Sequence, residues 1–222
     1  MERELQITAD GSHTLSIPSM QVTYHSKHGA IQESSHVFID AGLKYYTGLH
    51  PDQTIQILEI GFGTGLNCLL TAIYAREQKL SIQYHAIDAF PLLTEEARSL
   101  NHGQLLNNND LFQQLHACSW NQLHTIDTCF QLHKHHTSLE LFSANGLFDC
   151  VYYDAFAPSA QPELWTSTIF SQLFSMLGPG GILVTYCSKS DVRRAMQAAG
   201  FRVTKIQGPH GKREMVRAFK DA

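Results

Sequence analysis

The strongest chemical signal in the sequence is a glycine-rich segment, residues 59–67 (EIGFGTGLN), between a predicted strand and a predicted helix. Glycines let the backbone turn sharply and let a ligand approach the helix N-terminus. The spacing is GxGxG, whereas a nicotinamide site (GxGxxG) would place glycine at Leu66. With Glu59 before the glycines and Asp88 ending the next predicted strand, the pattern favours an adenosyl ligand without phosphates over a plain turn. Glu59 would meet its amino-acid end, and Asp88 would accept both ribose hydroxyls.

A second candidate group follows another buried strand, in residues 153–158 (YDAFAP). Ligands of an open parallel sheet bind at the carboxyl ends of its strands, which is where this loop would lie. At such a strand end Asp154 can hydrogen-bond an amine and stabilise a positive charge that develops on its nitrogen. Phe156 could pack against a flipped base. The competing interpretation makes Asp154 a simple turn residue, which its place at a strand end disfavours.

The elements that must position these residues alternate along the chain. Strands are predicted at residues 54–60, 81–88, 147–154, 182–187, 201–206 and 214–219, and helices at 66–78, 91–98, 162–177 and 191–199. This alternation predicts an α/β fold with a mostly parallel sheet and helices on both faces. Residues 1–50 are predicted to form an N-terminal β extension, with strands near 21–24 and 36–39, ahead of a main domain at 51–222. The segment 103–146 has no clear pattern.

Composition limits the class of protein. The 222 residues are 43% apolar and 16% charged, as in one ordinary globular domain with at most a modest extension. No apolar stretch approaches the roughly 20 residues of a membrane span, and no signal peptide is recognisable, so we expect a cytoplasmic protein. Five scattered cysteines without a CxxC pair argue against disulfides and a cysteine-based zinc site. The net charge of −4, taken alone, argues against a nucleic-acid partner.

Several motifs resemble known families. The glycine loop resembles motif I of class I S-adenosylmethionine (SAM) methyltransferases, as does the turn GPGG with the apolar strand after it. The YDAFAP loop resembles the Asp-Pro-Pro-aromatic loop of amino-group methyltransferases. More specific are residues 22–39, 153–165 (YDAFAPSAQPELW), 191–194 (DVRR), 199–201 (AGF) and 211–215 (GKREM). Together they resemble the tRNA 5-aminomethyl-2-thiouridine methyltransferases, the MnmD-type domain, over almost the whole chain except 103–146.

This resemblance implies a Rossmann-like, seven-stranded, SAM-dependent N-methyltransferase. It would convert 5-aminomethyl(-2-thio)uridine to 5-methylaminomethyl(-2-thio)uridine at the wobble position of the tRNA anticodon stem-loop. Bifunctional members continue into a flavin-dependent oxidase domain, whose activity we expect to be absent because the sequence ends at Ala222. Asp154 would orient the acceptor amine, with Phe156 and Pro158 shaping the loop. The residues expected to hold SAM are Tyr24, Glu59, Gly61, Phe62, Gly63, Thr64, Gly65, Asn67, Asp88 and Ser138.

Two positions depart from the family pattern. Family members often have an acid near the adenine after the third strand, and Ser138 stands nearest that position here. An arginine is also common where Ser35 stands. The first departure leaves adenine recognition without its usual acid.

Histidines are numerous, with seven of the thirteen between residues 85 and 136. A metal site could use the adjacent His133, His135 and His136, but neither matched acids or cysteines nor a clear scaffold accompany them. We therefore expect surface histidines and no metal, because methyl transfer from SAM to an amine needs none.

The C-terminal segment is basic although the whole chain is acidic. From Tyr186 onward there are nine lysines and arginines and three acids. We expect several to face tRNA phosphates: Lys189, Arg193, Arg194, Lys212 and Arg213. A solvated helix face is the competing interpretation of Arg193 and Arg194. Two other functions stay open: a SAM methyltransferase for a small-molecule or protein amine, and a non-catalytic SAM-binding domain, which the acid at 154 disfavours.

Overall fold

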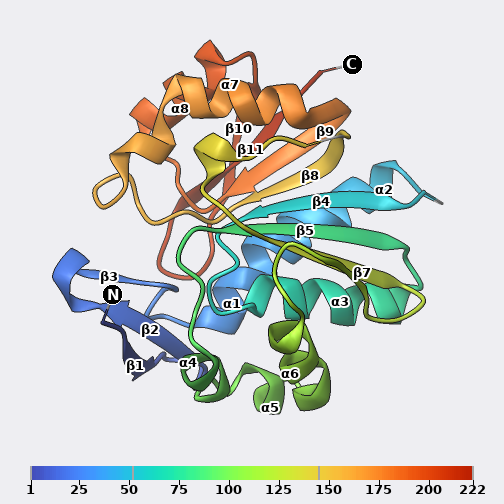
Figure 1. The fold of residues 1–222 in the computed structure, drawn as a ribbon. Coiled ribbons are helices and arrows are strands. Elements are labelled where there is room, and N and C mark those ends of the chain that lie inside the picture. Colours follow the sequence, from blue (N-terminus) through green and yellow to red (C-terminus); the bar gives the residue numbers. More distant parts are fainter. Residues whose placement is uncertain (1, 52, 145, 222) are drawn as a thin grey trace.

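An eight-stranded sheet forms the centre of the computed structural model, which describes residues 2–51, 53–144 and 146–221 (Figure 1). The five central strands, from β9 to β7, run parallel, whereas β11 is antiparallel to β9 and β10, and β6 to β7. The α/β class and the mostly parallel sheet are thus confirmed, with one strand more than predicted. In spatial order the strands are β10 (Arg202–Gln207), β11 (Glu214–Phe219), β9 (Leu177–Thr185), β8 (Phe148–Tyr153), β4 (Ile55–Ile60), β5 (Ile82–Asp88), β7 (Phe130–His136) and β6 (Leu123–Thr125).

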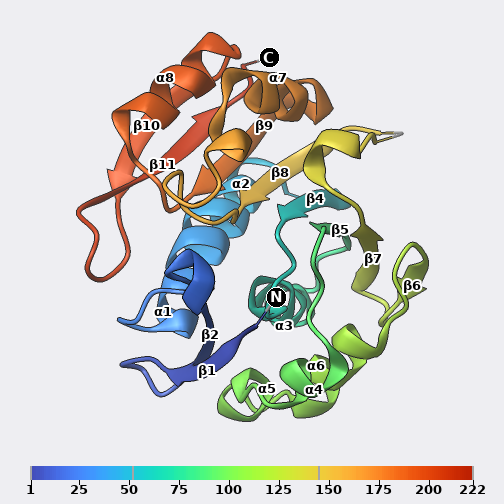
Figure 2. The same cartoon turned by 60° about the vertical axis from the view of Figure 1, so that its left-hand side comes forward.

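Helices cover both faces of this sheet (Figures 1 and 2). Successive residues of a strand point to opposite faces, so Ile57 of β4 joins one apolar core and Leu58 the other. The first core packs against α3 (Leu66–Gln78), α6 (Asn109–Ala117) and the helical run before β4, and the second against α7 (Ser167–Met176) and α8 (Ser190–Ala198). Within the described residues, no helix has both the length and the apolar character of a membrane span.

The N-terminal residues form a separate three-stranded antiparallel sheet of β1 (Glu4–Ile7), β2 (His13–Ile17) and β3 (Val22–Thr23). The strand predicted at 36–39 is wrong. These residues belong to a helical run made of α1 (Ala30–Ser34), a π-helical stretch (Ser35–Lys44) and α2 (Tyr45–Leu49). Val37, Phe38 and Ala41, which join the first core, lie at a helical spacing that the β-branched composition concealed. The division at residue 50 stays a prediction.

Other boundaries differ from the sequence-based expectation. The turn GPGG lies inside β9, where the Gly180 N–H donates to the carbonyl of Lys220 across the sheet at 2.9 Å. The helix expected to open at Pro91 begins later, as α4 (Thr94–Arg98), and the helix expected at 162–177 is a 3₁₀ turn (Pro162–Trp165) followed by α7. The segment 103–146 holds most of α5 (His102–Leu105), then α6, β6, β7 and a 3₁₀ turn (Leu139–Leu141).

Candidate active site

A cavity of about 320 Å³ lies where β4, β5 and β8 end, between the large sheet and the N-terminal sheet. Its walls combine residues from five separate parts of the chain. Among the residues predicted from the sequence, those that line it are Tyr24, Gly61, Phe62, Gly63, Thr64, Asn67, Asp88, Ser138, Asp154 and Phe156. Glu59, Gly65 and Pro158 are not in its lining: Glu59 lies buried in β4, Gly65 precedes α3, and Pro158 follows Phe156 in the loop.

The glycine loop depends on backbone conformations that other residues rarely adopt. Gly61, Gly63 and Gly65 have φ angles of +91°, +49° and +72°. A Cβ at Gly65 would lie 2.8 Å from His116 Nε2, and one at Gly61 would lie 3.1 Å from the carbonyl oxygen of Asp154. The loop can therefore pass close to β8, leaving its main chain along the cavity wall.

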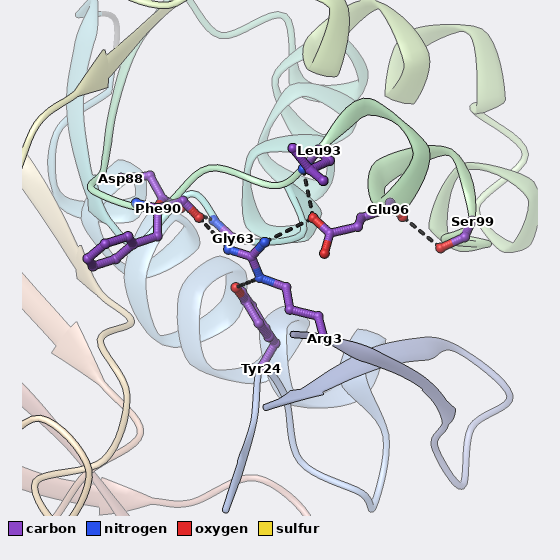
Figure 3. A network of polar contacts seen from close by, with 8 residues as sticks. All are labelled: Arg3, Tyr24, Gly63, Asp88, Phe90, Leu93, Glu96 and Ser99. Carbon is purple, nitrogen blue, oxygen red and sulfur yellow. Dashed lines mark hydrogen bonds and ion pairs between the residues drawn. The ribbon is translucent and has the colours of Figure 1, made fainter. Parts of the chain in front are cut away.

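Asp88 holds this loop in place from the end of β5 (Figure 3). Its Oδ2 accepts a 2.9 Å hydrogen bond from the Gly63 N–H, and its Oδ1 accepts one of 2.8 Å from Phe90. Burial raises the pKa of Asp88, against the lowering effect of these two backbone donors. The carboxylate thus stands at the cavity wall with an orientation fixed by the main chain on both sides.

Arg3 ties the N-terminal sheet to the same region (Figure 3). Its side chain, 5% exposed, donates from Nε to Tyr24 Oη at 2.9 Å and from Nη2 to the Phe90 carbonyl at 2.6 Å. Its Nη1 forms an ion pair with Glu96 on α4 at 2.9 Å. Tyr24 in turn packs its ring edge-on against Phe156, with centroids 5.1 Å apart. A single guanidinium therefore connects Tyr24 and Phe90, which both line the cavity, to Glu96 on α4. No local signal in the sequence indicated this role.

Three acceptor groups gather at the carboxyl end of β4 and β8. Asn67 Nδ2 donates to Asp154 Oδ2 at 2.9 Å. Both carboxylate oxygens of Glu59 and the Oδ1 of Asn67 are buried without a hydrogen-bond partner among the described residues. Burial raises the pKa of Glu59 well above its usual value, and the nearby Asp154 carboxylate raises it further. Such a group of buried acceptors fits the positively charged amino-acid end of a sulfonium ligand.

Asp154 sits in the same environment and titrates close to neutrality. Burial raises its pKa to about 7, with the Asn67 hydrogen bond opposing the shift, Glu33 adding to it and Lys212 opposing it. Its backbone N–H donates to the carbonyl of Ile60 on β4 at 3.1 Å, which fixes the start of the loop. The carboxyl group is therefore both anchored and able to change protonation state near pH 7.

Hydrogen bonds with three side chains hold the loop after Asp154 in place. Trp165 Nε1 donates to the Phe156 carbonyl and Tyr186 Oη to the Ala155 carbonyl, each at 2.8 Å. Gln161 Oε1 accepts from the Phe156 N–H at 3.2 Å. These bonds fix the Phe156 ring at the cavity. Gln161 and Trp165 belong to the motif at 153–165, although no role was predicted for them, and Tyr186 lies outside it.

An acidic residue lies close to Ser138, the position where the sequence lacked the usual acid. Ser138 lines the cavity, as does Glu140 two residues later, in the 3₁₀ turn after β7. Glu140 could have been proposed from the sequence because it lies two residues after Ser138. It was not, because the segment 103–146 has no clear pattern and the end of β7 could not be located.

The predicted phosphate contacts divide into paired and unpaired side chains. Lys212 Nζ forms a 2.7 Å ion pair with Glu33, and Arg194 pairs with Asp191 on its own helix. Arg193 Nε donates to the Ser188 carbonyl at 3.2 Å. Lys189 and Arg213 are exposed and have no side-chain hydrogen bond within residues 2–51, 53–144 and 146–221.

A doubly wound sheet with a glycine loop after β4, an acid ending β5 and a cavity at this edge defines a class I SAM-dependent methyltransferase. The comparison with known families agrees. A model described as S-adenosyl-L-methionine-dependent methyltransferase matches residues 106–221, just over half of the chain, and the chain belongs to that family. The matched region includes residues 106–146, most of the segment that had no clear pattern in the sequence.

A curated relative and two solved structures show more specifically which proteins the chain resembles. The "tRNA 5-methylaminomethyl-2-thiouridine biosynthesis bifunctional protein MnmC" of Actinobacillus pleuropneumoniae serotype 5b (strain L20) is 30% identical over 219 residues, covering 87% of this chain. The chain spans 31% of that relative's length. The crystal structure of MnmC2 from Aquifex aeolicus matches 98% of this chain and 70% of its own, with 27% identity and a TM-score of 0.73. Spermidine synthase from Thermotoga maritima, at 13% identity and a TM-score of 0.57 over 98% of this chain and 68% of its own, shows the fold alone.

Proposed function

We propose that this methyltransferase acts on the exocyclic amine of 5-aminomethyl(-2-thio)uridine at the tRNA wobble position, producing the methylaminomethyl nucleoside. The observation that carries the proposal is Asp154, held by Asn67 in the cavity shared with the glycine loop. The similarity to MnmC and MnmC2 supports the tRNA substrate. The partner would be the anticodon stem-loop, and the place of action the cytoplasm.

SAM would bind in the cavity, against the residues that line it. When bound, SAM supplies an electrophilic methyl group on a sulfonium. Asp88 would accept the ribose hydroxyls, and Glu59 and the free Oδ1 of Asn67 would receive the positively charged amino-acid end. The main chain of the loop from Gly61 to Gly65 would lie along the ligand, with Tyr24, Phe62, Thr64 and Ser138 completing the wall.

Asp154 would act on the amine. Because its pKa is about 7, an appreciable fraction is ionised at neutral pH. The acceptor amine attacks as the neutral base, having lost its ammonium proton to water. The Asp154 carboxylate would accept a hydrogen bond from that amine and stabilise the positive charge that develops on nitrogen. Phe156, backed by Tyr24, would stack on the uracil ring, and Pro158 would shape the loop.

The test is methylation of a defined tRNA. The purified chain is incubated with SAM and tRNA carrying 5-aminomethyl-2-thiouridine, and the nucleosides are measured by mass spectrometry. We expect that nucleoside to gain the mass of one methylene, while tRNA with unmodified uridine at the same position stays unchanged. If a small-molecule or protein amine is the true acceptor, both tRNAs stay unchanged and SAM is consumed only when such an amine is added. SAM binding without turnover on any amine would indicate a non-catalytic domain.

A further inference from the structure

Three histidines gather on two neighbouring strands of the large sheet. His133 and His135 are two residues apart on β7, so both point to the same face. His85 of β5 is the register partner of His133 and points to that face as well. One nitrogen from each imidazole can be chosen so that all three lie within 4.8 Å of one another, and His85 Nδ1 lies 3.0 Å from His135 Nε2. His136, which the sequence grouped with them, lies beside Trp120 instead.

The surroundings of this histidine cluster, defined as His85, His133 and His135, suit a bound cation. Its rings are partly buried and lie against Phe148 and Phe142, with centroids 5.3 Å and 4.9 Å away. A metal ion binds the neutral form of an imidazole, which keeps a lone pair on one ring nitrogen.

The ammonium group of Lys134 points away from the histidine cluster. Lys134 lies between His133 and His135 on β7 but points to the opposite face, where its Nζ donates to the carbonyls of Leu115 and His116 at 2.9 Å. No carboxylate joins the cluster among the described residues. Three imidazole nitrogens thus converge on a face that the Lys134 ammonium does not reach.

We propose that His85, His133 and His135 bind one divalent transition-metal ion of the zinc class. Imidazole nitrogens coordinate Zn²⁺ at about 2.0–2.1 Å, so three of them around one ion lie roughly 3.3 Å apart. The hydrogen bond between His85 Nδ1 and His135 Nε2 already holds two nitrogens 3.0 Å apart, and the ion would take the place of the shared proton. The third nitrogen lies within 4.8 Å of both, so it would have to move closer on binding. Three protein ligands leave a fourth position for water or an incoming group.

The ion would join β5 to β7 next to the cavity. Asp88 and Ile87, which line the cavity, follow His85 on β5, and Thr137 and Ser138 follow His135. A metal that binds only the folded chain adds its binding free energy to stability. The proposed ion therefore strengthens the edge of the sheet that supports the glycine-loop acid, and it takes no part in methyl transfer.

The experiment uses the full chain without an affinity tag, stripped with a chelator and then titrated with Zn²⁺ in competition with a chromophoric chelator. We expect one ion per chain. His85→Ala, His133→Ala and His135→Ala should each weaken binding by more than about tenfold, since removing a ligand costs at least as much as removing a group that supports one. The matched control is His136→Ala, on the same strand but outside the cluster, which should bind Zn²⁺ like the unmodified chain.

Two further readouts keep the assignment falsifiable. Zn²⁺ should raise the thermal midpoint of the unmodified chain and of His136→Ala, but not that of the double variant His133→Ala/His135→Ala, whose folding is checked by circular dichroism. Co²⁺ should give a four-coordinate absorption spectrum only in chains with the intact cluster. Binding that survives in the double variant would place the ion elsewhere, for example on the partly exposed thiols of Cys118 or Cys129, and would overturn the proposal. Equal weakening by His136→Ala, or no saturable one-to-one binding, would overturn it too.

Discussion

At the scale of single residues, we expect Glu59 to lower the stability of the folded chain and to strengthen the binding of SAM. Its carboxylate is fully buried and unpaired among the described residues, and burial holds its pKa well above the usual value. The folded chain therefore binds this proton more tightly than the unfolded chain does, and Glu59 costs stability progressively as pH rises from the unfolded pKa towards the folded one. We expect Glu59→Gln to raise the thermal midpoint without SAM, with a larger gain at pH 8 than at pH 4. Differential scanning calorimetry at both pH values measures this.

The same variant should bind SAM more weakly, because an amide is a poorer partner for a cation than a carboxylate is. Titration calorimetry compares the two chains. Glu77→Gln, on the exposed side of α3, is the control and should change neither property. A Glu59→Gln chain that is less stable, or that binds SAM with full affinity, would remove Glu59 from the proposed role.

We expect Asp154 to make the turnover rate depend on pH. Its carboxyl group ionises around pH 7, so turnover should rise through that region and continue to rise as the amine loses its own proton. Asp154→Asn should lower kcat by about 10²–10⁴-fold and remove the inflection near pH 7, while SAM binding survives. Asp110→Asn, an exposed change on α6, is the control. An unchanged profile in Asp154→Asn would assign the titration to another group.

Which residues the sequence could identify depended on how local their contacts are. The glycines and Asp88 were recognisable because strand, turn and ligand chemistry lie within a short stretch of chain. Arg3 was not, because its partner Glu96 is 93 residues away and only the tertiary fold brings them together. The histidine cluster was not recognisable for the same reason, since His85, which joins His133 and His135, comes from a different strand.

At the scale of elements, the main α/β alternation was predictable because buried parallel strands and amphipathic helices have different periods. The helix at 36–39 was missed because its valine, phenylalanine and isoleucine also suit a strand, and a contact with the sheet decided the outcome. The strand boundary at GPGG was missed because cross-strand hydrogen bonding from Gly180 overrides its turn-forming composition.

The position of the N-terminal sheet relative to the cavity depends on Arg3. Removing its side chain leaves Tyr24 and the loop after β5 without their common donor. We expect Arg3→Ala to raise KM for SAM by about tenfold, equivalent to about 1.4 kcal/mol, with a smaller effect on kcat. Steady-state kinetics separate the two. Arg98→Ala, an exposed arginine on the same helix as Glu96, should behave like the unmodified chain; a loss of kcat alone in Arg3→Ala would contradict a positioning role.

At the scale of the whole molecule, the net charge of −4 hides a basic C-terminal segment. The structure shows that much of this charge is already neutralised. Arg194, Arg202 and Lys205 pair with the three acids of the segment, and Lys212 pairs with Glu33. Lys212 also lies 4.1 Å from the Tyr186 ring centre, so it supports the active-site loop more than it offers a free cation. The count of basic residues therefore overstates the surface available to phosphates.

The unpaired cations should account for binding to tRNA. Lys189 follows β9 at the carboxyl edge of the sheet, and Arg213 lies in the loop between β10 and β11, next to Lys212. We expect Lys189→Ala/Arg213→Ala to weaken tRNA binding and to reduce the slope of log Kd against log salt by roughly 0.7–0.9 for each phosphate that the variant no longer neutralises. Fluorescence anisotropy at several salt concentrations measures both. Arg202→Ala removes an equally exposed but paired charge and should leave the slope unchanged, because Asp221 already neutralises it. If Arg202→Ala lowered the slope as much as the double variant, tRNA would be held by the diffuse charge of the segment, and the assignment to two side chains would be wrong.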